Sequence, residues 1–521
     1  MKFKLLALDT EDDSNGHVQI INFFDGEKHY TFTGPDMRLE AWTFLKELPP
    51  CQVWACNLEY DLINLFGDWL GSMVTLQYTK GGLIRGSFRD RAGITFYDSL
   101  RHWPIGVKGM GDIIGLQKKE VNGNFNDIDY CQTDTEIVWR FVSTMIDRYE
   151  DLKLKCKATL PAMTLQLLER FYKIPRNSIP ADLQDFFRGG YYGGRVEIFR
   201  LGEIEGQINY YDINSLYPSV MKNGLYPDLD TFYETEKPNF EKEGIAEVEI
   251  EYPRDHYITA VPVRTDTEII YPYGRLAGKW CYPEIRQALS DGARLIRVKR
   301  AIEFSKTCKP FSGYVDYCYA ARLEAKNRAD KLDDVFWKLF LNSCYGKFGM
   351  GGELSLIYNN RDLKIKSKAS YVNVIWAAYV TSYGRLRLLK ELRSVEPYYC
   401  DTDSVFTSDE LPEGKDLGEI KLEGRFRKCQ FIGNKIYTLT DNKNNVKEKA
   451  KGINKNVAGD FIRTGKAVFK KPMRFREARK SIAGIANKWY TVTKENRKSY
   501  CKRRILKDGS TEPWNIKDFK I

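Results

Sequence analysis

Two acidic clusters, far apart in the chain, constrain the fold most, because each follows an apolar, strand-like run. The first is Asp212 within the run YYDINSLYPS at 210–219, and the second is Asp401 and Asp403 within YYCDTDS at 398–404. If the two strands are neighbours, Asp212 and Asp403 meet at one edge of a sheet. Such a pair repels itself unless divalent cations bind it, and carboxylates on oxygen-rich loops suit Mg²⁺. Taken alone, each cluster is equally compatible with a turn or a helix cap.

A third motif lies between these clusters, in the run KLFLNSCYG at 338–346. On a helix, Lys338, Asn342 and Tyr345 fall at i, i+4 and i+7, so one face carries an ammonium, an amide and a ring. That face could hold a nucleoside triphosphate, with Lys338 on the phosphates and Tyr345 against the base. Arg322 and Lys326, four residues apart, would add cations for the phosphates. The alternative is an amphipathic helix whose lysine extends to solvent.

The composition excludes a small module and a disordered chain. The 521 residues are 43% hydrophobic and 29% charged, which predicts several globular domains. No apolar run reaches the roughly 18 residues of a membrane helix, and no signal peptide is visible, so we expect an intracellular protein. The eleven cysteines are odd in number and scattered, which favours reduced core thiols.

The positive charge is concentrated at the end of the chain. Residues 443–521 hold 23 Lys and Arg against 7 Asp and Glu, a balance of +16, which leaves −5 for the preceding residues. Aromatic residues interrupt this basic segment, as they do in folded elements that stack on bases. The segment predicts a polyanionic partner, although a solvated charged surface is an equally common origin of such a run.

Hydrophobic periodicity divides the chain into an α/β region and a second mixed region. Strands are expected at 3–8, 18–24 and 30–33 and a helix at 135–149, in a domain that ends near residue 175. Further strands are expected at 207–212, 246–251, 257–264, 395–407 and 431–439, and helices at 311–345 and 375–392. A glycine-rich junction at 188–194 predicts a linker with close backbone approach.

In this order the three motifs, DxxSLYPS at Asp212, KxxxNSxYG at Lys338 and YxDTDS at Tyr399, resemble motifs A, B and C of family B DNA polymerases. The resemblance implies a palm in which Asp212 and Asp403 bind two metal ions, with the Ile213 carbonyl assisting and Asp401 nearby. It also implies a set of residues around the incoming dNTP and another around the primer. The dNTP set is Ser215, Leu216, Tyr217, Arg322, Lys326, Lys338, Asn342 and Tyr345, with Tyr217 as the steric gate against a ribose 2′-OH. The run Lys435-Ile436-Tyr437 resembles the KxY motif that holds the primer terminus.

The amino-terminal part resembles the DEDDy 3′-5′ exonucleases through DTE at 9–11, NLEYD at 57–61 and YCQTD at 130–134. Asp9 and Glu11 are two apart on a strand and so project from one face. The resemblance implies that Asp61 and Asp134 complete a two-metal site, that Tyr130 orients the attacking water, and that Asn57 touches the primer strand.

Within family B the chain is most similar to the protein-primed polymerases of bacteriophages and linear plasmids. Phe187-Arg188-Gly189-Gly190 resembles their (Y/F)xGG motif, and YDSL at 97–100 followed by Lys108 resembles their exonuclease loop. Of these residues, Lys108, Arg188, Gly189 and Gly190 are therefore expected to contact DNA, as are Lys435 and Tyr437 of the KxY motif. The segment at 349–372, where that group carries an insertion around the template, is short here, which leaves strand displacement, processivity and protein priming open.

The resemblance implies an α/β and α+β multidomain chain, an RNase H-like exonuclease followed by a right-hand polymerase. The expected domains are an exonuclease at 1–175, a palm at 176–305 and 395–445, fingers at 306–394 and a thumb at 446–521. The implied function is DNA-directed DNA synthesis with 3′-5′ proofreading, replicating a phage, viral or plasmid genome in the host cytoplasm. Its cofactors would be two Mg²⁺ per site, replaceable by Mn²⁺, and its partners primer-template DNA and dNTPs, with a terminal protein primer and a single-stranded-DNA-binding protein as further candidates.

Two other functions are compatible with parts of the sequence. A nuclease that trims DNA 3′ ends would retain only vestigial polymerase activity. A non-catalytic DNA-binding factor would lack at least one carboxylate in each site, and none is missing.

Overall fold

The computed structural model describes residues 4–13, 15–79, 81–120, 127–175, 179–350, 355–359, 362–366, 373–472, 474, 489–495 and 500–519. The chain forms two compact units, each built from separate stretches of sequence. The first holds Met1–Arg170, Cys318–Tyr371 and Lys470–Thr491, and the second holds Phe171–Tyr317, Val372–Phe469 and Val492–Ile521. In the described part of the chain, no helix is long and apolar enough to cross a membrane.

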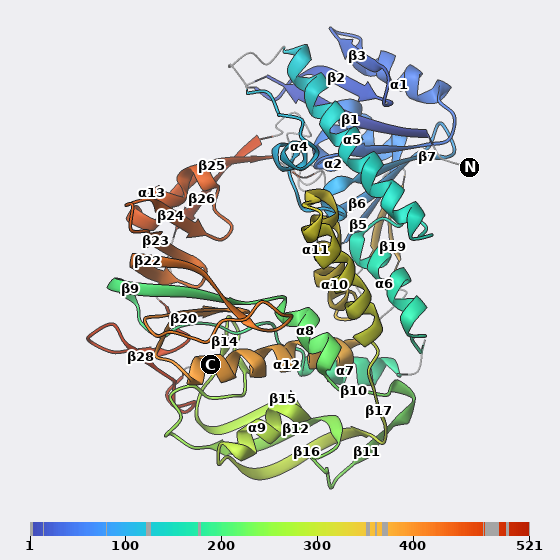
Figure 1. Cartoon of the computed structure of the whole chain (residues 1–521). Helices are drawn as coiled ribbons and strands as arrows, with labels where there is room; N and C mark the ends of the chain where they lie inside the picture. The colour runs from blue at the N-terminus through green and yellow to red at the C-terminus, as the bar shows by residue number, and fades with distance from the viewer. Residues whose placement is uncertain are drawn as a thin grey trace. The chain divides into compact units, whose positions relative to one another are not determined.

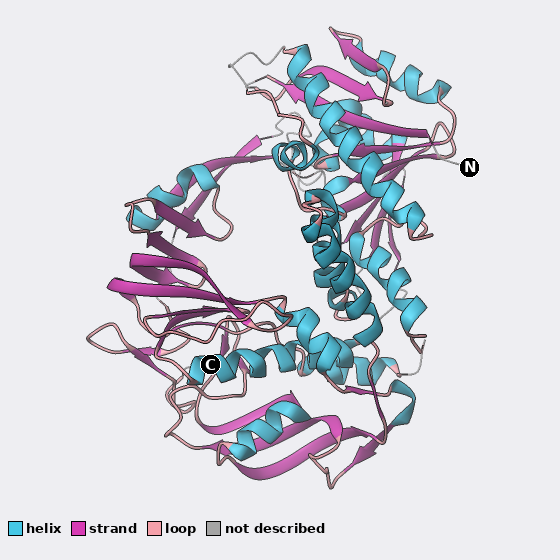
Figure 2. Cartoon of the chain, in the orientation of Figure 1, coloured by secondary structure: helices cyan, strands magenta, loops and turns pink. Residues whose placement is uncertain are grey.

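The first unit is built on a nine-stranded mixed sheet (Figures 1 and 2) in the order β19-β18-β5-β6-β7-β4-β1-β2-β3. The strands are β1 (Lys4–Asp12), β2 (Val18–Phe24), β3 (His29–Thr33), β4 (Cys51–Ala55), β5 (Val74–Thr79), β6 (Gly82–Phe88), β7 (Ile94–Asp98), β18 (Ser355–Asn359) and β19 (Asp362–Lys366). Strand β1 runs parallel to β4 and β4 parallel to β7, whereas the other pairs are antiparallel. The short 349–372 segment thus supplies a hairpin that extends this sheet.

Helices cover the sheet of the first unit and position its polar residues. They are α1 (Met37–Glu47), α2 (Leu58–Phe66), α3 (Leu70–Met73), α4 (Val107–Ile114), α5 (Ile128–Asp151), α6 (Leu160–Phe171) and α11 (Lys331–Ser343). Both α2 and α5 pack on β1, whose apolar residues Leu6 and Leu8 are fully buried. Helix α11 is held to α5 by the Arg148–Asp333 ion pair, 2.6 Å, and by the ring of Tyr149.

The second unit contains a seven-stranded sheet in the order β24-β23-β22-β9-β21-β20-β8. Its strands are β8 (Val196–Ile198), β9 (Gly202–Ile213), β20 (Pro397–Asp401), β21 (Ser404–Thr407), β22 (Ile420–Gly433), β23 (Ile436–Thr440) and β24 (Val446–Ala450). Helices α8 (Leu216–Asn223) and α12 (Val374–Arg393) pack against each other (Figure 1), and α12 also contacts β21. The fully buried Tyr211 and Cys400 belong to the core beneath the sheet.

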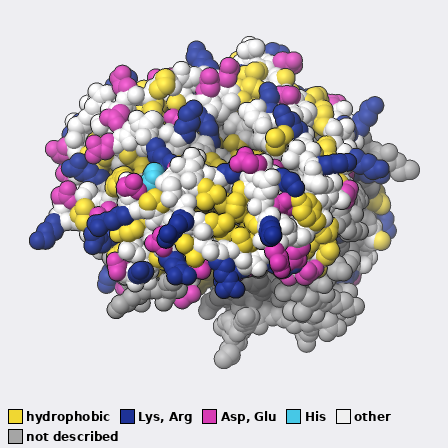
Figure 3. All heavy atoms as spheres, turned by 90° about the horizontal axis from the view of Figure 1, so that it is seen from below, with side chains coloured by type: hydrophobic (Ala, Val, Ile, Leu, Met, Phe, Trp, Pro, Cys, Tyr) yellow, Lys and Arg dark blue, Asp and Glu magenta, His cyan; other side chains and the backbone are white. Residues whose placement is uncertain are grey.

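A second, four-stranded sheet in this unit has the order β11-β16-β12-β15. Its strands are β11 (Phe232–Thr235), β12 (Glu243–Tyr252), β15 (Gly274–Cys281) and β16 (Arg294–Phe304), and α9 (Tyr282–Ser290) packs on it. Ion pairs such as Arg300–Glu234 and Lys299–Glu247 cross neighbouring strands. On the face in Figure 3, Lys and Arg side chains are interspersed with Asp and Glu, so the described residues there do not form a single cationic surface.

The smaller elements of the second unit connect these sheets and close the chain. They are α7 (Ala181–Gly189), β10 (Tyr226–Pro227), β13 (Val263–Arg264), β14 (Ile269–Ile270), β17 (Thr307–Cys308), α13 (Ala458–Thr464), β27 (Arg504–Ile505) and β28 (Thr511–Glu512). Strands β25 (Lys466–Pro472) and β26 (Trp489–Glu495) and helix α10 (Ser312–Asn327) span both units. The Tyr500 hydroxyl accepts from the Ile198 N–H, 2.8 Å, and the buried Arg503 donates to the Tyr257 carbonyl, 2.9 Å, so the carboxyl-terminal segment packs beside β8.

Several sequence predictions need correction. The strand expected at 257–264 is reduced to Val263–Arg264, because the preceding residues form turns and irregular chain. The helix expected at 311–345 is two helices, α10 and α11, separated where Ala329 takes a φ of 55°. The strand expected at 395–407 is the hairpin β20–β21. Of the eleven cysteines expected to be core thiols, seven are buried and four, Cys56, Cys156, Cys308 and Cys501, are half-buried. The division into exonuclease, palm, fingers and thumb remains a prediction.

Candidate active sites

The acidic clusters of the second unit meet at one edge of its sheet, as the sequence predicts. Strand β21 pairs with β9 so that Ser404 lies opposite Asp212, and the Ile213 N–H donates to the Asp403 carbonyl over 2.7 Å. Asp401 ends β20 and Asp403 lies in the turn that leads to β21. Burial and the neighbouring charge of Asp401 raise the pKa of Asp403.

A lysine neutralises one of these carboxylates. The Lys435 ammonium forms an ion pair with Asp401, and the Lys435 N–H donates to the Tyr399 hydroxyl over 3.1 Å. Tyr437, from the same KxY motif, is buried in the cluster of rings around Tyr399 and Phe431. The ion pair thus fixes Asp401 beside Asp403, and Asp212 and Asp403 remain the carboxylates predicted to hold cations.

The turns that carry this site adopt strained backbone. Ser215, Thr402 and Lys435 have φ of 51°, 66° and 62°, in the left-handed region that L residues avoid. Each such residue costs on the order of 1–3 kcal/mol and persists where the surroundings fix it. The Thr402 N–H donates to the Arg195 carbonyl over 2.7 Å, so the chain after the glycine-rich junction supports the turn of motif C.

The four glycines of that junction differ in how closely they pack. A Cβ at Gly189 would lie 2.6 Å from Lys279 Cδ, and one at Gly190 would lie 2.5 Å from Ile245 Cδ1. These two glycines, expected to contact DNA, thus have a packing role within the unit, as does Gly194 against Thr402. Arg188, also expected to contact DNA, is half-buried in the last turn of α7.

Motif A continues into helix α8, whose N-cap and first two residues are consecutive members of the predicted dNTP set. Ser215 is the N-cap, Leu216 is buried and Tyr217 is half-buried. Gly384 of α12 leaves room for the Tyr217 ring, because a Cβ there would lie 3.0 Å from Tyr217 Cε1. Sequence reasoning missed Gly384, which no motif marks.

The predicted triphosphate residues belong to the first unit. Lys338 and Asn342 are exposed on one face of α11, as their spacing predicts. Tyr345 departs from that prediction: α11 ends at Ser343 and Tyr345 starts a 3₁₀ turn, so the helical spacing does not reach it. Arg322 is buried and paired with Asp334 over 2.8 Å, whereas Lys326 is exposed on α10.

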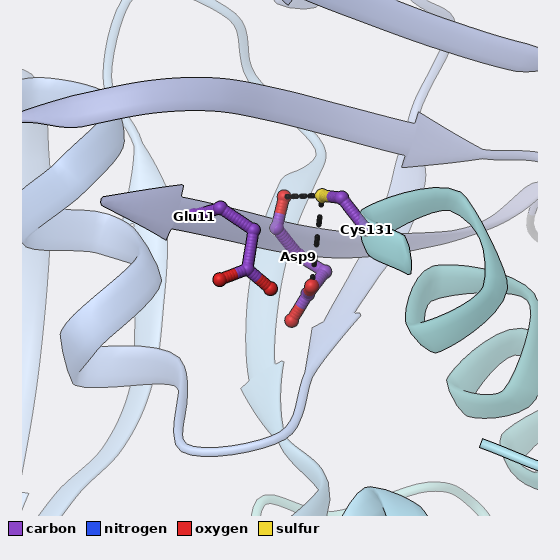
Figure 4. A group of neighbouring side chains, drawn as sticks. All are labelled: Asp9, Glu11 and Cys131. Atoms are coloured by element: carbon purple, nitrogen blue, oxygen red, sulfur yellow. Dashed lines mark hydrogen bonds between the residues drawn. The ribbon is translucent and has the colours of Figure 1, made fainter. Parts of the chain in front are cut away.

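The four carboxylates of the exonuclease motifs gather in the first unit. Asp9 and Glu11 project from β1 (Figure 4), Asp61 lies in the first turn of α2, and Asp134 lies in α5. The Thr10 hydroxyl donates to Asp61 over 2.8 Å. Asp61 and Asp134 are only 2% and 3% exposed, so the strand and two helices enclose the cluster.

Burial and mutual repulsion dominate the electrostatics of this cluster. Burial, followed by the charges of Asp61, Glu11 and Asp134, raises the pKa of Asp9 well above its usual value. Burial and the charge of Asp134 raise the pKa of Glu11 to about 7. The pKa of Asp61 is raised chiefly by burial. A divalent cation would relieve the repulsion that these shifts express.

Sequence reasoning missed one cation of this site, Lys118. Its ammonium forms an ion pair with Asp134 and lies 4.5 Å from the centre of the Tyr130 ring. Burial would lower the pKa of Lys118, but hydrogen bonds to Asp134 and Tyr130 outweigh it and raise that pKa. Lys118 precedes α5 beside a second lysine, Lys119, so no spacing rule singles it out.

Asn57, expected to touch the primer strand, and Lys108, expected to contact DNA, belong to the same unit. Asn57 precedes α2 with a φ of 74°, and its N–H donates to Asp98 over 3.2 Å. Asp98 also accepts from the Leu100 N–H, so the exonuclease loop holds Asn57 in place. Lys108 is exposed on α4.

The carboxylate oxygens of the cluster in the first unit fit hard divalent cations. Among the described residues, Asp61 Oδ2 and Asp134 Oδ1 are buried without a hydrogen-bond partner. Buried carboxylate oxygens without donors are costly and are satisfied when a cation binds. Two ions held by such oxygens suit phosphoryl transfer.

Comparison with known proteins finds DNA polymerases. The family model described as DNA polymerase type B, organellar and viral, matches residues 112–381, just over half of the chain. The DNA-directed DNA polymerase of Enterobacteria phage PRD1 is 27% identical over 499 residues, which cover 87% of this chain and 86% of that protein. A probable DNA polymerase of Podospora anserina is 25% identical over 403 residues, 64% of this chain and 32% of that longer protein.

The fold has a close counterpart among solved structures. Phi29 DNA polymerase complexed with primer-template DNA and incoming nucleotide substrates matches with a TM-score of 0.76 and 15% identity. The match covers 95% of this chain and all of that one. The multidomain architecture expected from the sequence is thereby confirmed, and the chain belongs to the organellar and viral family of type B DNA polymerases.

Proposed function

We propose that this DNA-directed DNA polymerase couples synthesis at the Asp212–Asp403 edge to 3′-5′ proofreading at the Asp9–Asp134 cluster. The observation that carries the proposal is that the chain builds two separate carboxylate sites, each with a lysine bound to one carboxylate. Two divalent cations at each site, with Mg²⁺ as the physiological ion and Mn²⁺ as a substitute, would stabilise the attacking and leaving oxygens of phosphoryl transfer.

In the polymerase reaction, the primer 3′-hydroxyl attacks the α-phosphate of the dNTP and pyrophosphate leaves. Asp212 and Asp403 are the carboxylate ligands, and Lys435 holds Asp401 and the primer terminus. Lys338 and Lys326 bind the triphosphate, and Arg322, through its pair with Asp334, positions α10 against α11. The ring of Tyr217 excludes a ribose 2′-hydroxyl.

In the exonuclease reaction, water attacks the terminal phosphodiester and releases a nucleotide. Asp9, Glu11, Asp61 and Asp134 hold the cations, and the Tyr130 hydroxyl orients the water. Lys118, bound to Asp134 and beside Tyr130, fixes the position of both side chains and supplies positive charge for the phosphate.

Its substrates are primer-template DNA and dNTPs, and the matching Phi29 enzyme is likewise complexed with primer-template DNA and incoming nucleotide substrates. The surplus of +16 in residues 443–521 grips the duplex backbone, so binding weakens steeply with salt. We further propose that it replicates a phage, viral or plasmid genome in a host cytoplasm and starts from the hydroxyl of a terminal protein, aided by a single-stranded-DNA-binding protein. A protein found covalently attached to the 5′ ends of that genome would support this priming mode, and free 5′ ends would contradict it.

A primer-extension assay tests both reactions together. A 5′-labelled primer on a longer template is incubated with Mg²⁺, with and without dNTPs, for the unaltered chain, Asp403→Asn and Asp9→Asn. We expect Asp403→Asn to abolish extension and retain degradation, and Asp9→Asn to do the reverse.

Matched controls are Glu410→Gln and Asp129→Asn, whose side chains are 73% and 77% exposed and pair with the surface cations Arg425 and Lys119. Both should behave as the unaltered chain does. If the unaltered chain degrades the primer and never extends it, the end-trimming nuclease becomes the better description.

A further inference from the structure

The four carboxylates Asp9, Glu11, Asp61 and Asp134 form the exonuclease cluster. Beside them lies a thiol that neither proposed reaction uses. Cys131 lies in the first turn of α5, next to Tyr130, and is fully buried. Its Sγ lies 3.6 Å from Asp9 Oδ2 and 3.7 Å from the Asp9 carbonyl oxygen. Figure 4 shows the side chains of Asp9, Glu11 and Cys131 converging, and one ligand atom from each lies within 4.8 Å of the others.

These distances resemble those around a tetrahedral ion. Zinc binds sulfur at about 2.3 Å and carboxylate oxygen at about 2.0–2.2 Å, which places the two ligand atoms roughly 3.5 Å apart. The Sγ–Oδ2 distance of 3.6 Å has this length. Half-buried Glu11 offers the third ligand atom, within 4.8 Å of the other two.

A second observation shows that the cluster lacks positive charge. Asp61 Oδ2 on α2 and Asp134 Oδ1 on α5 are buried and have no hydrogen-bond partner among the described residues. Lys118 contributes one cation against four carboxylates. A divalent cation would satisfy these oxygens. A thiolate ligand shifts the preference of the site to Zn²⁺, because oxygen-only sites favour Mg²⁺.

We propose that Asp9, Glu11 and Cys131 form a Zn²⁺ site inside the exonuclease cluster. On binding, the S–H bond breaks, the S–Zn bond forms, and the proton leaves to solvent with no change of oxidation state. The site needs only these ligands, so it stands whether or not the exonuclease is active. If the proofreading proposal also holds, Zn²⁺ displaces Mg²⁺ from the Asp9 position and inhibits proofreading.

The ordinary alternative is that Cys131 is a small buried side chain whose S–H donates to Asp9. The two differ in whether sulfur binds the metal, which Co²⁺ reports by a sulfur-to-metal charge-transfer band. We expect one equivalent of Co²⁺ to produce this band in the full-length, metal-stripped chain, and Zn²⁺ to remove it where equal Mg²⁺ does not.

Single-residue variants test which thiol gives rise to the charge-transfer band. Cys131→Ser should abolish it, and Asp9→Asn should weaken Co²⁺ binding by about tenfold or more, as loss of a ligand or its support does. Cys156→Ser is the matched control, because Cys156 is a half-buried thiol of the same unit that donates only to the Lys157 carbonyl, and it should retain the band. A band that survives in Cys131→Ser overturns the proposal.

One measurement needs no variant and so does not depend on the folding of Cys131→Ser. X-ray absorption of the unaltered chain loaded with one equivalent of Zn²⁺ should show a single sulfur neighbour at about 2.3 Å. A shell of oxygen and nitrogen alone would show that Cys131 is a buried donor and no ligand. The zinc–sulfur shell reports metal binding, whereas loss of exonuclease activity in Asp9→Asn reports proofreading. Either proposal can therefore fail while the other stands.

Discussion

The two carboxylate sites of this chain are held in place by different means. In the exonuclease cluster, one strand and two helices bury Asp61 and Asp134, and the pKa of Glu11 rises to about 7. At the polymerase edge, Asp212 and Asp403 are half-buried, and the turns that present them depend on residues with positive φ. Electrostatic repulsion is more extensive in the first site, where the pKa values of four carboxylates are raised, than in the second, where that of Asp403 is raised. The second site also carries the backbone strain of three turn residues with positive φ.

The largest expected effects test this difference directly. Asp61→Asn keeps the hydrogen bond from Thr10 and removes one buried charge, so exonuclease activity should fall by about 10²–10³-fold while the metal-free unit becomes more stable. Asp212→Asn should lower polymerisation by a similar factor without that gain in stability. Activity assays and denaturant unfolding in EDTA measure the two effects. Equal stability changes in both variants would remove the proposed distinction.

The lysines give the next largest effect. Lys118→Met and Lys435→Met each remove the cation bound to one carboxylate, Asp134 or Asp401, at pairs whose lysines are 24% and 27% exposed. Each variant should slow its own reaction by roughly 10–100-fold, because positive charge and positioning are lost, and leave the other reaction unchanged. Single-turnover rates for extension and degradation separate the two. A fall in both rates for either variant would show that the sites are coupled.

Sequence alone predicted the polymerase edge better than the exonuclease cluster. Alternation and the DTDS turn place Asp403 at the tip of a strand pair, and the register of β9 with β21, in which Ser404 lies opposite Asp212, confirms that the two strands are neighbours. Sequence reasoning missed Lys118 because its contact with Asp134 is a tertiary one, which no local pattern encodes. Cys131 was read as a core thiol, since its distance to Asp9 arises only when α5 packs on β1.

Errors of element length have similar origins. The spacing of Lys338, Asn342 and Tyr345 suits a continuous helix, but α11 ends at Ser343 and continues as a 3₁₀ turn. The strand expected at 257–264 alternates as strands do, yet only Val263–Arg264 finds a partner strand, β14. Periodicity reports which residues are buried, whereas pairing depends on tertiary neighbours.

A smaller effect is expected where the glycine-rich junction supports the motif C turn. In Gly194→Ala the new Cβ would lie 2.8 Å from the Thr402 side chain, which forces the turn bearing Asp403 to shift. Polymerisation should fall by about tenfold, because small displacements of reacting groups are costly, and degradation should not change. Gly193→Ala is the matched control, since nothing lies within 4 Å of its added Cβ. Equal losses in both variants would show that the junction acts through chain flexibility.

The smallest effect concerns the pH dependence of the metal-free exonuclease cluster. The pKa of Glu11 is about 7 in the folded chain against an ordinary 4.5, so the folded state retains a proton that the unfolded chain releases. This contribution to stability is complete below about pH 4.5 and is lost as the pH rises through about 7. Hydrogen exchange in EDTA, corrected for the intrinsic exchange rate at each pH, measures the local stability of β1 and α5. This local stability should fall by roughly 1 kcal/mol between pH 5 and 8, after allowance for solvent screening.

Two controls decide whether Glu11 is the origin of this loss. Glu11→Gln does not titrate, so its local stability should stay level over the same pH range, and saturating Mg²⁺ should flatten the profile of the unaltered chain, because the bound cation favours the ionised carboxylates. Exchange in β9 and β21, measured in the same samples, supplies the internal comparison at the polymerase edge. A pH profile that persists in Glu11→Gln would assign the loss of stability to Asp9 and Asp61, whose pKa values are also raised. The repulsion would then lie between those two carboxylates and their neighbours, with no contribution from Glu11.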